Sequence, residues 1–270
     1  MATSGADAGA ERFSRVFDVL ELLVGHSGGM TLTEIVKRLG LPASSAHNLL
    51  QRMAAINLVV VTEDLRYSIG SRAVRLGIRI VDGVEVRTLA RRPMQELARE
   101  TGDDIYLAVR MGNRVFYVDK VAGTRPITVD IRLGQPLYLH ATAVGKLFAA
   151  NNRQLYRRLM AEDRPRLTSH TLTTQQELDA ALEKIRADDY SVSREEAILG
   201  IVGMAYPIRD AYGELAAAIH VSAPLAQIDA KHERALLDAA REAARSIERE
   251  LGRMETPETR TVRRAAADAS

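Results

Sequence analysis

The segment that most constrains the fold is residues 31–50, TLTEIVKRLGLPASSAHNLL, which has the pattern of two short helices joined by a tight turn. Thr31 and Glu34 have the spacing of a capping box, and apolar residues follow them at helical spacing. Gly40 suits the left-handed residue that ends a helix, and Pro42 suits the start of the next one. The segment therefore predicts a helix-turn-helix, a motif whose second helix lies in the DNA major groove.

The predicted second helix, about residues 43–56, has an apolar side and a polar side. A core is expected to bury its apolar residues, which are Ala46, Leu49, Leu50 and Met53. Polar side chains near the start of such a helix reach base edges and phosphates. We therefore expect contacts to double-stranded DNA from Thr31, Ser44, Ser45, His47, Asn48, Gln51, Arg52 and Arg66. Ordinary exposed helix positions would also explain the serines and His47, and a solvated arginine cluster would explain Arg66.

The residues around this motif complete a winged helix. Apolar residues at helical spacing predict a first helix before it, and two short strands joined by residues 62–64 predict a hairpin wing after it. The winged helix-turn-helix domain is thus expected over residues 11–70. Residues 71–86 predict a linker helix whose apolar positions favour packing against a second copy of the chain. Residues 1–10, which are small and polar, are expected to form a disordered tail.

The rest of the chain predicts an α+β domain over residues 87–253. Alternating apolar residues predict two hairpins, one over 105–120 and the other over 201–222, and a further strand over 126–131. Helices are expected at 87–100, 144–151, 153–160, 174–187 and 225–253. Consecutive hairpins with segregated helices predict an antiparallel sheet with helices on one face. The tail over 254–270 is expected to be disordered.

Composition and motif spacing exclude several classes of function. The absence of Cys excludes disulfides and thiolate metal sites, and the six His residues form no HExxH motif or close cluster, so no metal and no cofactor is expected. No apolar run approaches about 18 residues, and no signal peptide precedes the first helix, which predicts a cytoplasmic protein without a membrane partner. The GxSxG match at residues 25–29 lacks a preceding strand and a helix directly after it. No enzyme is therefore predicted.

From about Arg12 to Leu251 the chain resembles the IclR family of bacterial transcriptional regulators. The resemblance rests on the sequences GLP at 40–42, YSIG at 67–70, TGD at 101–103, LHATAVGK at 139–146, EE at 195–196 and VSAP at 221–224. It implies a winged helix-turn-helix domain, a linker helix and a ligand-binding domain with a GAF-like antiparallel sheet. It also implies homodimers, or dimers of dimers, that bind palindromic operator DNA near genes for small-molecule catabolism.

The resemblance further implies a pocket for a small carboxylate between the sheet and the helix that begins near residue 143. The backbone N–H groups of Ala143, Val144 and Gly145 are expected to bind the anion at that helix N-terminus. Where relatives often carry an acidic residue, a Cys and a Ser, this chain has Ser193, Gly203 and His220, and it retains Ser222. Tyr106 and Tyr206 are added as pocket candidates, although core positions would also explain both tyrosines.

These departures favour one class of effector over another. Loss of a carboxylate and a thiol, together with the gain of Tyr206 and His220, predicts a roomier site that accepts an aromatic acid such as a hydroxybenzoate. A keto acid such as glyoxylate or pyruvate is the alternative. The recognition helix departs from the family as well, since basic residues common at the positions of Ala43 and Asn48 are missing. The expected function is ligand-responsive, DNA-binding transcriptional regulation, and the alternative is a sensor whose winged helix mediates protein association.

Overall fold

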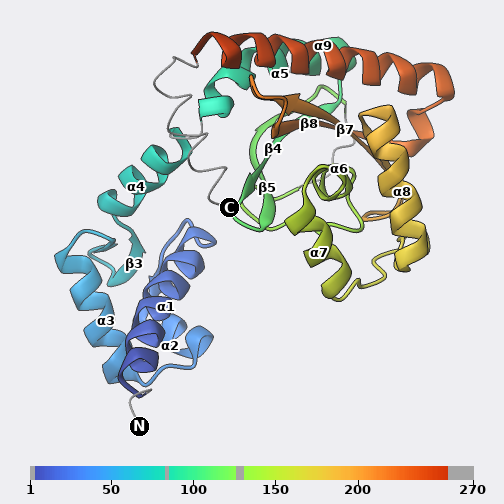
Figure 1. Cartoon of the computed structure of the whole chain (residues 1–270). Coiled ribbons are helices and arrows are strands. Elements are labelled where there is room, and N and C mark those ends of the chain that lie inside the picture. Colours follow the sequence, from blue (N-terminus) through green and yellow to red (C-terminus); the bar gives the residue numbers. More distant parts are fainter. Residues whose placement is uncertain (1–3, 83–84, 126–130, 255–270) are drawn as a thin grey trace. The chain divides into compact units, whose positions relative to one another are not determined.

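The computed structural model describes residues 4–82, 85–125 and 131–254, and the chain divides into two compact units, residues 1–83 and 84–270. The N-terminal unit carries a short antiparallel sheet in the order β1-β3-β2. Its elements are α1 (Ser4–Val24), β1 (Met30–Thr31), α2 (Leu32–Leu39), α3 (Ala43–Ala55), β2 (Val59–Val61), β3 (Arg66–Ile69) and α4 (Ser71–Asp82). Helices α2 and α3 with the β2–β3 hairpin confirm the predicted winged helix-turn-helix (Figure 1).

Local signals set the ends of the helix-turn-helix. The Glu34 backbone N–H donates to Thr31 Oγ1 at 3.3 Å, and the Thr31 N–H donates to Glu34 Oε2 at 2.7 Å, so the predicted capping box is present. Gly40 closes α2 in the left-handed conformation, with φ +64°. Ile35, Leu50 and other apolar residues of α1, α2, α3 and the small sheet form one core. Leu49, expected in that core, is only half-buried at its edge.

Two predicted boundaries differ from the structure. Helix α1 begins at Ser4, so residues 4–10 are helical rather than a disordered tail. The linker helix, predicted over 71–86, ends at Asp82, next to Gly83, a residue type that disfavours helix continuation. Most of the strand predicted over 126–131, and the tail over 255–270, lie outside the described residues.

The C-terminal unit contains a five-stranded antiparallel sheet in the order β5-β4-β8-β7-β6. Its elements are α5 (Glu85–Thr101), β4 (Asp104–Met111), β5 (Arg114–Val121), α6 (Ala143–Asn151), α7 (Arg153–Ala161), α8 (Gln175–Asp188), β6 (Ser191–Arg194), β7 (Ile201–Arg209), β8 (Leu215–Pro224), the 3-10 helix η1 (Leu225–Gln227) and α9 (Ala230–Met254). The two predicted hairpins form β4–β5 and β7–β8. The short strand β6 was not predicted, and the last helix begins at Ala230 rather than at 225.

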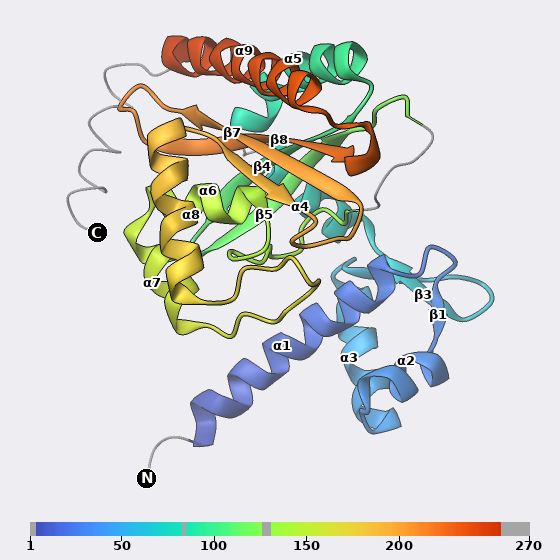
Figure 2. The same cartoon turned by 90° about the vertical axis from the view of Figure 1, so that its right-hand side faces the viewer.

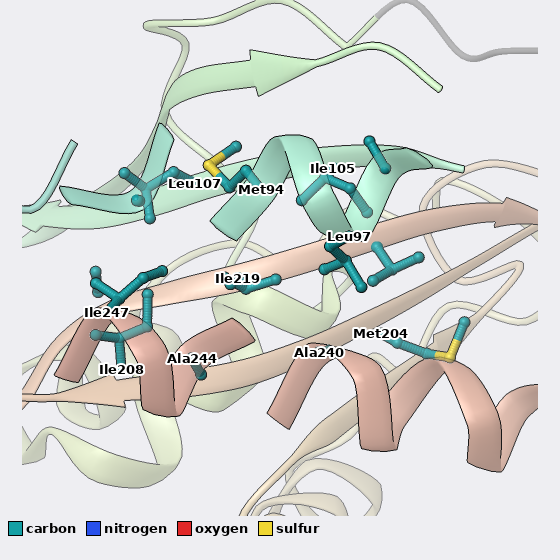
Figure 3. Packing of buried hydrophobic residues seen from close by; sticks show 14 of the residues in the cluster. Met94, Leu97, Ile105, Leu107, Met204, Ile208, Ile219, Ala240, Ala244 and Ile247 are labelled. Atoms are coloured by element: carbon teal, nitrogen blue, oxygen red, sulfur yellow. The ribbon is translucent and has the colours of Figure 1, made fainter. Parts of the chain in front are cut away.

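The prediction that helices cover one face of this sheet is wrong, because helices cover both faces. Helices α5 and α9 lie side by side over one face, while α6, α7 and α8 lie on the other (Figures 1 and 2). Along β4, Ile105 and Leu107 pack toward α5 and α9, and the alternate residues Tyr106 and Ala108 pack toward α6. Figure 3 shows the first of these cores, where Met94 and other side chains of α5 and α9 meet the strands.

Within the described residues, none of the helices combines the length and the apolar character needed to cross a membrane. The same residues contain no group of three or more His, Asp or Glu side chains placed to hold a metal ion.

Candidate functional site

A cavity of about 110 Å³ lies in the C-terminal unit, between the α6 face of the sheet and the N-terminus of α6. Its lining is mostly apolar and contains no Lys, Arg, Asp or Glu among the described residues. The lining residues are Tyr117, Ile131, Leu137, Thr142, Ala143, Ser193, Ala197, Ile198, Ile201, Gly203, His220 and Ser222. For comparison, an engineered cavity of roughly 150 Å³ admits benzene. At about 110 Å³ the space is somewhat smaller than that, so an aromatic ligand would require the cavity walls to move apart.

Strand register builds the floor of this cavity. Gly203 of β7 pairs with Ser193 of β6 on one side and with Ser222 of β8 on the other, so these residues form a row across the sheet. His220 lies two residues before Ser222 on the same strand and faces the same side. The cavity thus brings together five of the residues expected to bind the effector, including Ala143 at the start of α6.

Val144 and Gly145 are buried in α6 and are not among the described residues that line the cavity. A Cβ on Gly145 would lie 2.5 Å from the Tyr138 carbonyl oxygen, so Gly145 lets the preceding segment pack against the helix. The Gly145 N–H donates to Thr142 Oγ1 at 3.0 Å, which caps the helix. These positions shape the helix N-terminus instead of forming the cavity wall.

The assignment of Tyr206 to the pocket is wrong. Residues three apart in a strand point to opposite faces, and Gly203 faces the cavity. Tyr206 therefore faces α9, where Arg241 Nε donates to its hydroxyl at 3.0 Å. Tyr106 lies on the α6 face but is fully buried behind the lining, with its ring centroid 5.0 Å from that of Tyr117.

Several lining residues were not predicted from the sequence. Tyr117 pairs with Ala108 on β4, two residues from Tyr106, so the predicted hairpin register contained a usable signal for it. Thr142 caps α6, and the preference for Thr at the position before a helix was a usable signal for it. The remaining unpredicted residues, Ile131, Leu137, Ala197, Ile198 and Ile201, lie in irregular segments or at a strand end. Periodicity does not predict where such residues lie.

His220 is held neutral at the cavity floor. Its side chain is enclosed by the sheet and by Tyr117, and this burial lowers its pKa from 6.5 to about 3. His220 Nδ1 lies 2.9 Å from the Tyr117 hydroxyl oxygen, within hydrogen-bond distance. Burial also raises the pKa of Tyr117 well above its ordinary value. Both groups are therefore uncharged near neutral pH.

This neutral histidine makes stability depend on pH. Below about pH 6.5 the unfolded chain protonates the imidazole, whereas the folded protein does not until about pH 3, so stability is lost as the pH falls through this window. The expected slope from this group is about 1.4 kcal/mol per pH unit. Urea unfolding from pH 6.5 to 4.5 should show a steeper loss for the natural chain than for a Tyr117→Phe/His220→Leu variant. Equal slopes would contradict the assignment.

A buried ion pair connects α6 to the loop that follows β6, next to the cavity. Lys146 Nζ lies 2.5 and 2.6 Å from the two carboxylate oxygens of Glu196, and both residues are buried. Burial lowers the pKa of Lys146 and raises that of Glu196, so each charge depends on its partner. Lys146 lies one helical turn beyond Ala143, and Ala197 directly follows Glu196. The pair therefore ties the helix side of the cavity to the loop that covers it.

The same loop is held by a second set of hydrogen bonds. Thr168 Oγ1 donates to the Glu195 carbonyl oxygen at 2.6 Å, and Thr171 Oγ1 donates to the Glu196 carbonyl oxygen at 2.7 Å. Glu195 accepts from the Gly200 N–H at 2.7 Å, which closes the loop on itself. Glu195 and Glu196, the EE motif of the family resemblance, thus have distinct structural contacts.

The polar side of α3, in the N-terminal unit, is exposed to solvent. The expected DNA contacts on this helix are all exposed, namely Ser44, Ser45, His47, Asn48, Gln51 and Arg52. Two expected contacts outside α3 have intramolecular partners. Thr31 caps α2, and Arg66 donates to the carbonyl oxygens of Gly28 and Gly29 at 3.0 and 2.9 Å. Arg66 thereby fastens the wing to the turn before α2.

A winged helix and a separate domain with a cavity, present in one chain, are the arrangement expected of a transcriptional regulator. The chain belongs to the IclR family: it matches the helix-turn-helix domain of IclR over residues 14–63 and the C-terminal domain of the bacterial transcriptional regulator IclR over residues 78–249. The family resemblance predicted from the sequence motifs is thereby confirmed.

Similar proteins agree with this assignment. The HTH-type transcriptional regulator BhcR of Paracoccus denitrificans is 32% identical over 242 residues, which cover 88% of this chain and 86% of BhcR. The crystal structure of Thermotoga maritima IclR has a TM-score of 0.77 at 26% identity and covers 90% of this chain and 99% of that one. An IclR homolog from Microbacterium hydrocarbonoxydans, solved in complex with 4-hydroxybenzoate, shares the fold with a TM-score of 0.79 at 24% identity, covering 89% and 98%.

Proposed function

We propose that this protein is a ligand-responsive transcriptional regulator, without catalytic activity, that binds operator DNA through α3 and a small organic acid in the cavity of the C-terminal unit. The observation that carries the proposal is the cavity itself, which strand register and the α6 N-terminus build in a chain with an exposed polar α3. The side chains of α3 would read the major groove, with Arg52 supplying a phosphate contact.

The proposed assembly is a homodimer or a dimer of dimers. Val74 and Leu76 of α4 are 48% and 54% exposed, and Phe13 and Phe17 of α1 are 72% and 62% exposed. Exposed large apolar side chains on helices of one unit favour burial against a second copy. A dimer would place two copies of α3 in successive major grooves.

The proposed effector is an aromatic acid such as a hydroxybenzoate. The cavity supports this class, since its lining is mostly apolar and includes the rings of Tyr117 and His220. The helix N-terminus at Thr142 and Ala143 would receive the carboxylate through backbone N–H groups. The 4-hydroxybenzoate complex of the Microbacterium hydrocarbonoxydans homolog gives a precedent on the same fold. A keto acid is the second candidate.

Effector binding is proposed to change operator affinity. A ligand shifts a conformational equilibrium only if it binds the DNA-competent and DNA-incompetent states differently. Helix α4 follows the winged helix in the chain and is the proposed carrier of that difference. Binding of an acid in the cavity should therefore alter the affinity for DNA in one direction or the other.

The effector class can be tested by calorimetric titration of the full-length protein. We expect 4-hydroxybenzoate to bind with measurable heat, because the lining is mostly apolar and includes two rings, and we expect glyoxylate and pyruvate to bind more weakly. A Gly203→Leu variant should bind the aromatic acid more weakly, because its larger side chain should fill the floor of the cavity. Binding of the keto acids alone would refute the aromatic class.

A further inference from the structure

At the floor of the cavity, the imidazole of His220 packs against Gly203 on the neighbouring strand. A Cβ built on Gly203 would lie 2.7 Å from His220 Nε2, closer than real Cβ contacts. Both residues face the α6 side of the sheet and line the cavity. Nε2 therefore occupies the place at the floor where a side chain at position 203 would stand, and only glycine leaves room for it.

The other ring nitrogen is held by the protein. Nδ1 lies 2.9 Å from the Tyr117 hydroxyl oxygen, and the two rings stack with centroids 5.3 Å apart and planes inclined by 23°. Tyr106 packs against the same imidazole, with a centroid distance of 5.8 Å. The His220 side chain is thus fixed by two aromatic rings and one hydrogen bond.

Nε2 is available to a ligand. His220 is only 5% exposed, and no hydrogen-bond partner for Nε2 is found among residues 4–82, 85–125 and 131–254. Nε2 borders the open space of the cavity, so a ligand that fills this space without a hydrogen bond to Nε2 loses affinity relative to one that makes it. Ser222, two residues along β8, presents its hydroxyl-bearing side chain to the same end of the cavity.

We propose that His220 is a specificity-determining residue that selects effectors with a hydroxyl group at the sheet end of the cavity, and that Gly203 makes room for it. The inference rests on the proposed binding of an organic acid there. A hydroxyl both donates and accepts, so it matches either neutral tautomer of the imidazole. A carboxylate at that end would meet a neutral ring and no cation among the described lining residues.

The consequence is an orientation for the effector. The hydroxyl group meets His220 and Ser222 at the sheet, the aromatic ring spans the apolar middle of the cavity, and the acid group meets the α6 N-terminus at Ala143. The selected class is therefore a hydroxy-substituted aromatic acid, as opposed to an unsubstituted one.

The experiment compares 4-hydroxybenzoate with benzoate, which lacks only the hydroxyl group, by calorimetry on the full-length protein. We expect 4-hydroxybenzoate to bind at least about 10-fold more tightly, since benzoate leaves Nε2 without a partner. A Tyr117→Phe/His220→Leu variant removes both partners together and should bind the two acids with similar affinity. Gly203→Ala should also reduce the preference, because its Cβ displaces the imidazole.

Tyr206→Phe is the matched control, because it removes a tyrosine hydroxyl on the opposite face of the sheet and should leave the preference unchanged. Equal binding of the two acids by the natural chain would overturn the hydroxyl selection while leaving the aromatic effector class intact. A preference that survives in the correctly folded double variant, judged by thermal unfolding, would also overturn it. Failure of both acids to bind would refute the effector class and the selection with it.

Discussion

Replacing Ser45 by Glu should lower operator affinity by about 100-fold or more, because like charges brought together in an interface cost several kcal/mol. Ser45 is exposed in the first turn of α3, where the side chains of a recognition helix meet DNA. The carboxylate would face the DNA phosphates and repel them. A gel-shift titration would measure the loss, using a duplex selected from a randomised library by the natural protein.

Ser45→Gln is the matched control for this substitution, because Gln has nearly the same shape as Glu without the charge. We expect the Gln variant to retain most of the affinity and both variants to bind the effector normally. The natural complex should also weaken steeply as salt concentration rises, as DNA binding through phosphates requires. Undiminished affinity in Ser45→Glu would refute the role of α3, and a weak salt dependence would favour a winged helix that mediates protein association.

Replacing Lys146 by Met should lower the free energy of unfolding of the C-terminal unit by about 3–5 kcal/mol, because it leaves the Glu196 carboxylate buried without its partner. The variant should also bind the effector more weakly, since Ala197 and Ile198 follow Glu196 in the loop that lines the cavity. Urea unfolding followed by circular dichroism at pH 8 would measure the first effect, and calorimetric titration the second.

The double variant Lys146→Met/Glu196→Leu separates the buried charge from the packing. Replacement of both partners by apolar residues removes the orphaned carboxylate, so we expect most of the stability to return. The loss in the single variant should shrink as the pH falls, since burial raises the pKa of Glu196 and a protonated carboxyl tolerates burial. A loss below about 1 kcal/mol at pH 8 in the single variant would contradict the importance of the pair.

Sequence patterns located the elements whose signals lie within a few residues of one another. The capping box at Thr31 marked a helix start correctly, because it depends on a partner three residues away, and the structure shows a second such box at Thr174 before α8. Alternating apolar residues over 105–120 likewise marked the β4–β5 hairpin, which turns at Gly112. The end of α4 at Asp82 and the start of α9 at Ala230 were less well predicted.

The candidate site was predicted in part for the same reason. Ser193, Gly203, His220 and Ser222 were expected from family motifs, and strand alternation placed His220 and Ser222 on one face. Alternation also separates Gly203 from Tyr206, three residues apart, although both were first assigned to the pocket.

By itself, the sequence determined the winged helix, the two hairpins and the family of this protein, since capping, periodicity and motif order are properties of neighbouring residues. Only the tertiary structure decided that helices cover both sheet faces and that Lys146 meets Glu196, 50 positions away. It also joined Tyr117 to His220, 103 positions apart. Strand β4 lies between their strands, and its Tyr106 ring faces α6 together with the rings of Tyr117 and His220. Strand order sets such distant contacts, and strand order depends on which faces the whole chain can bury.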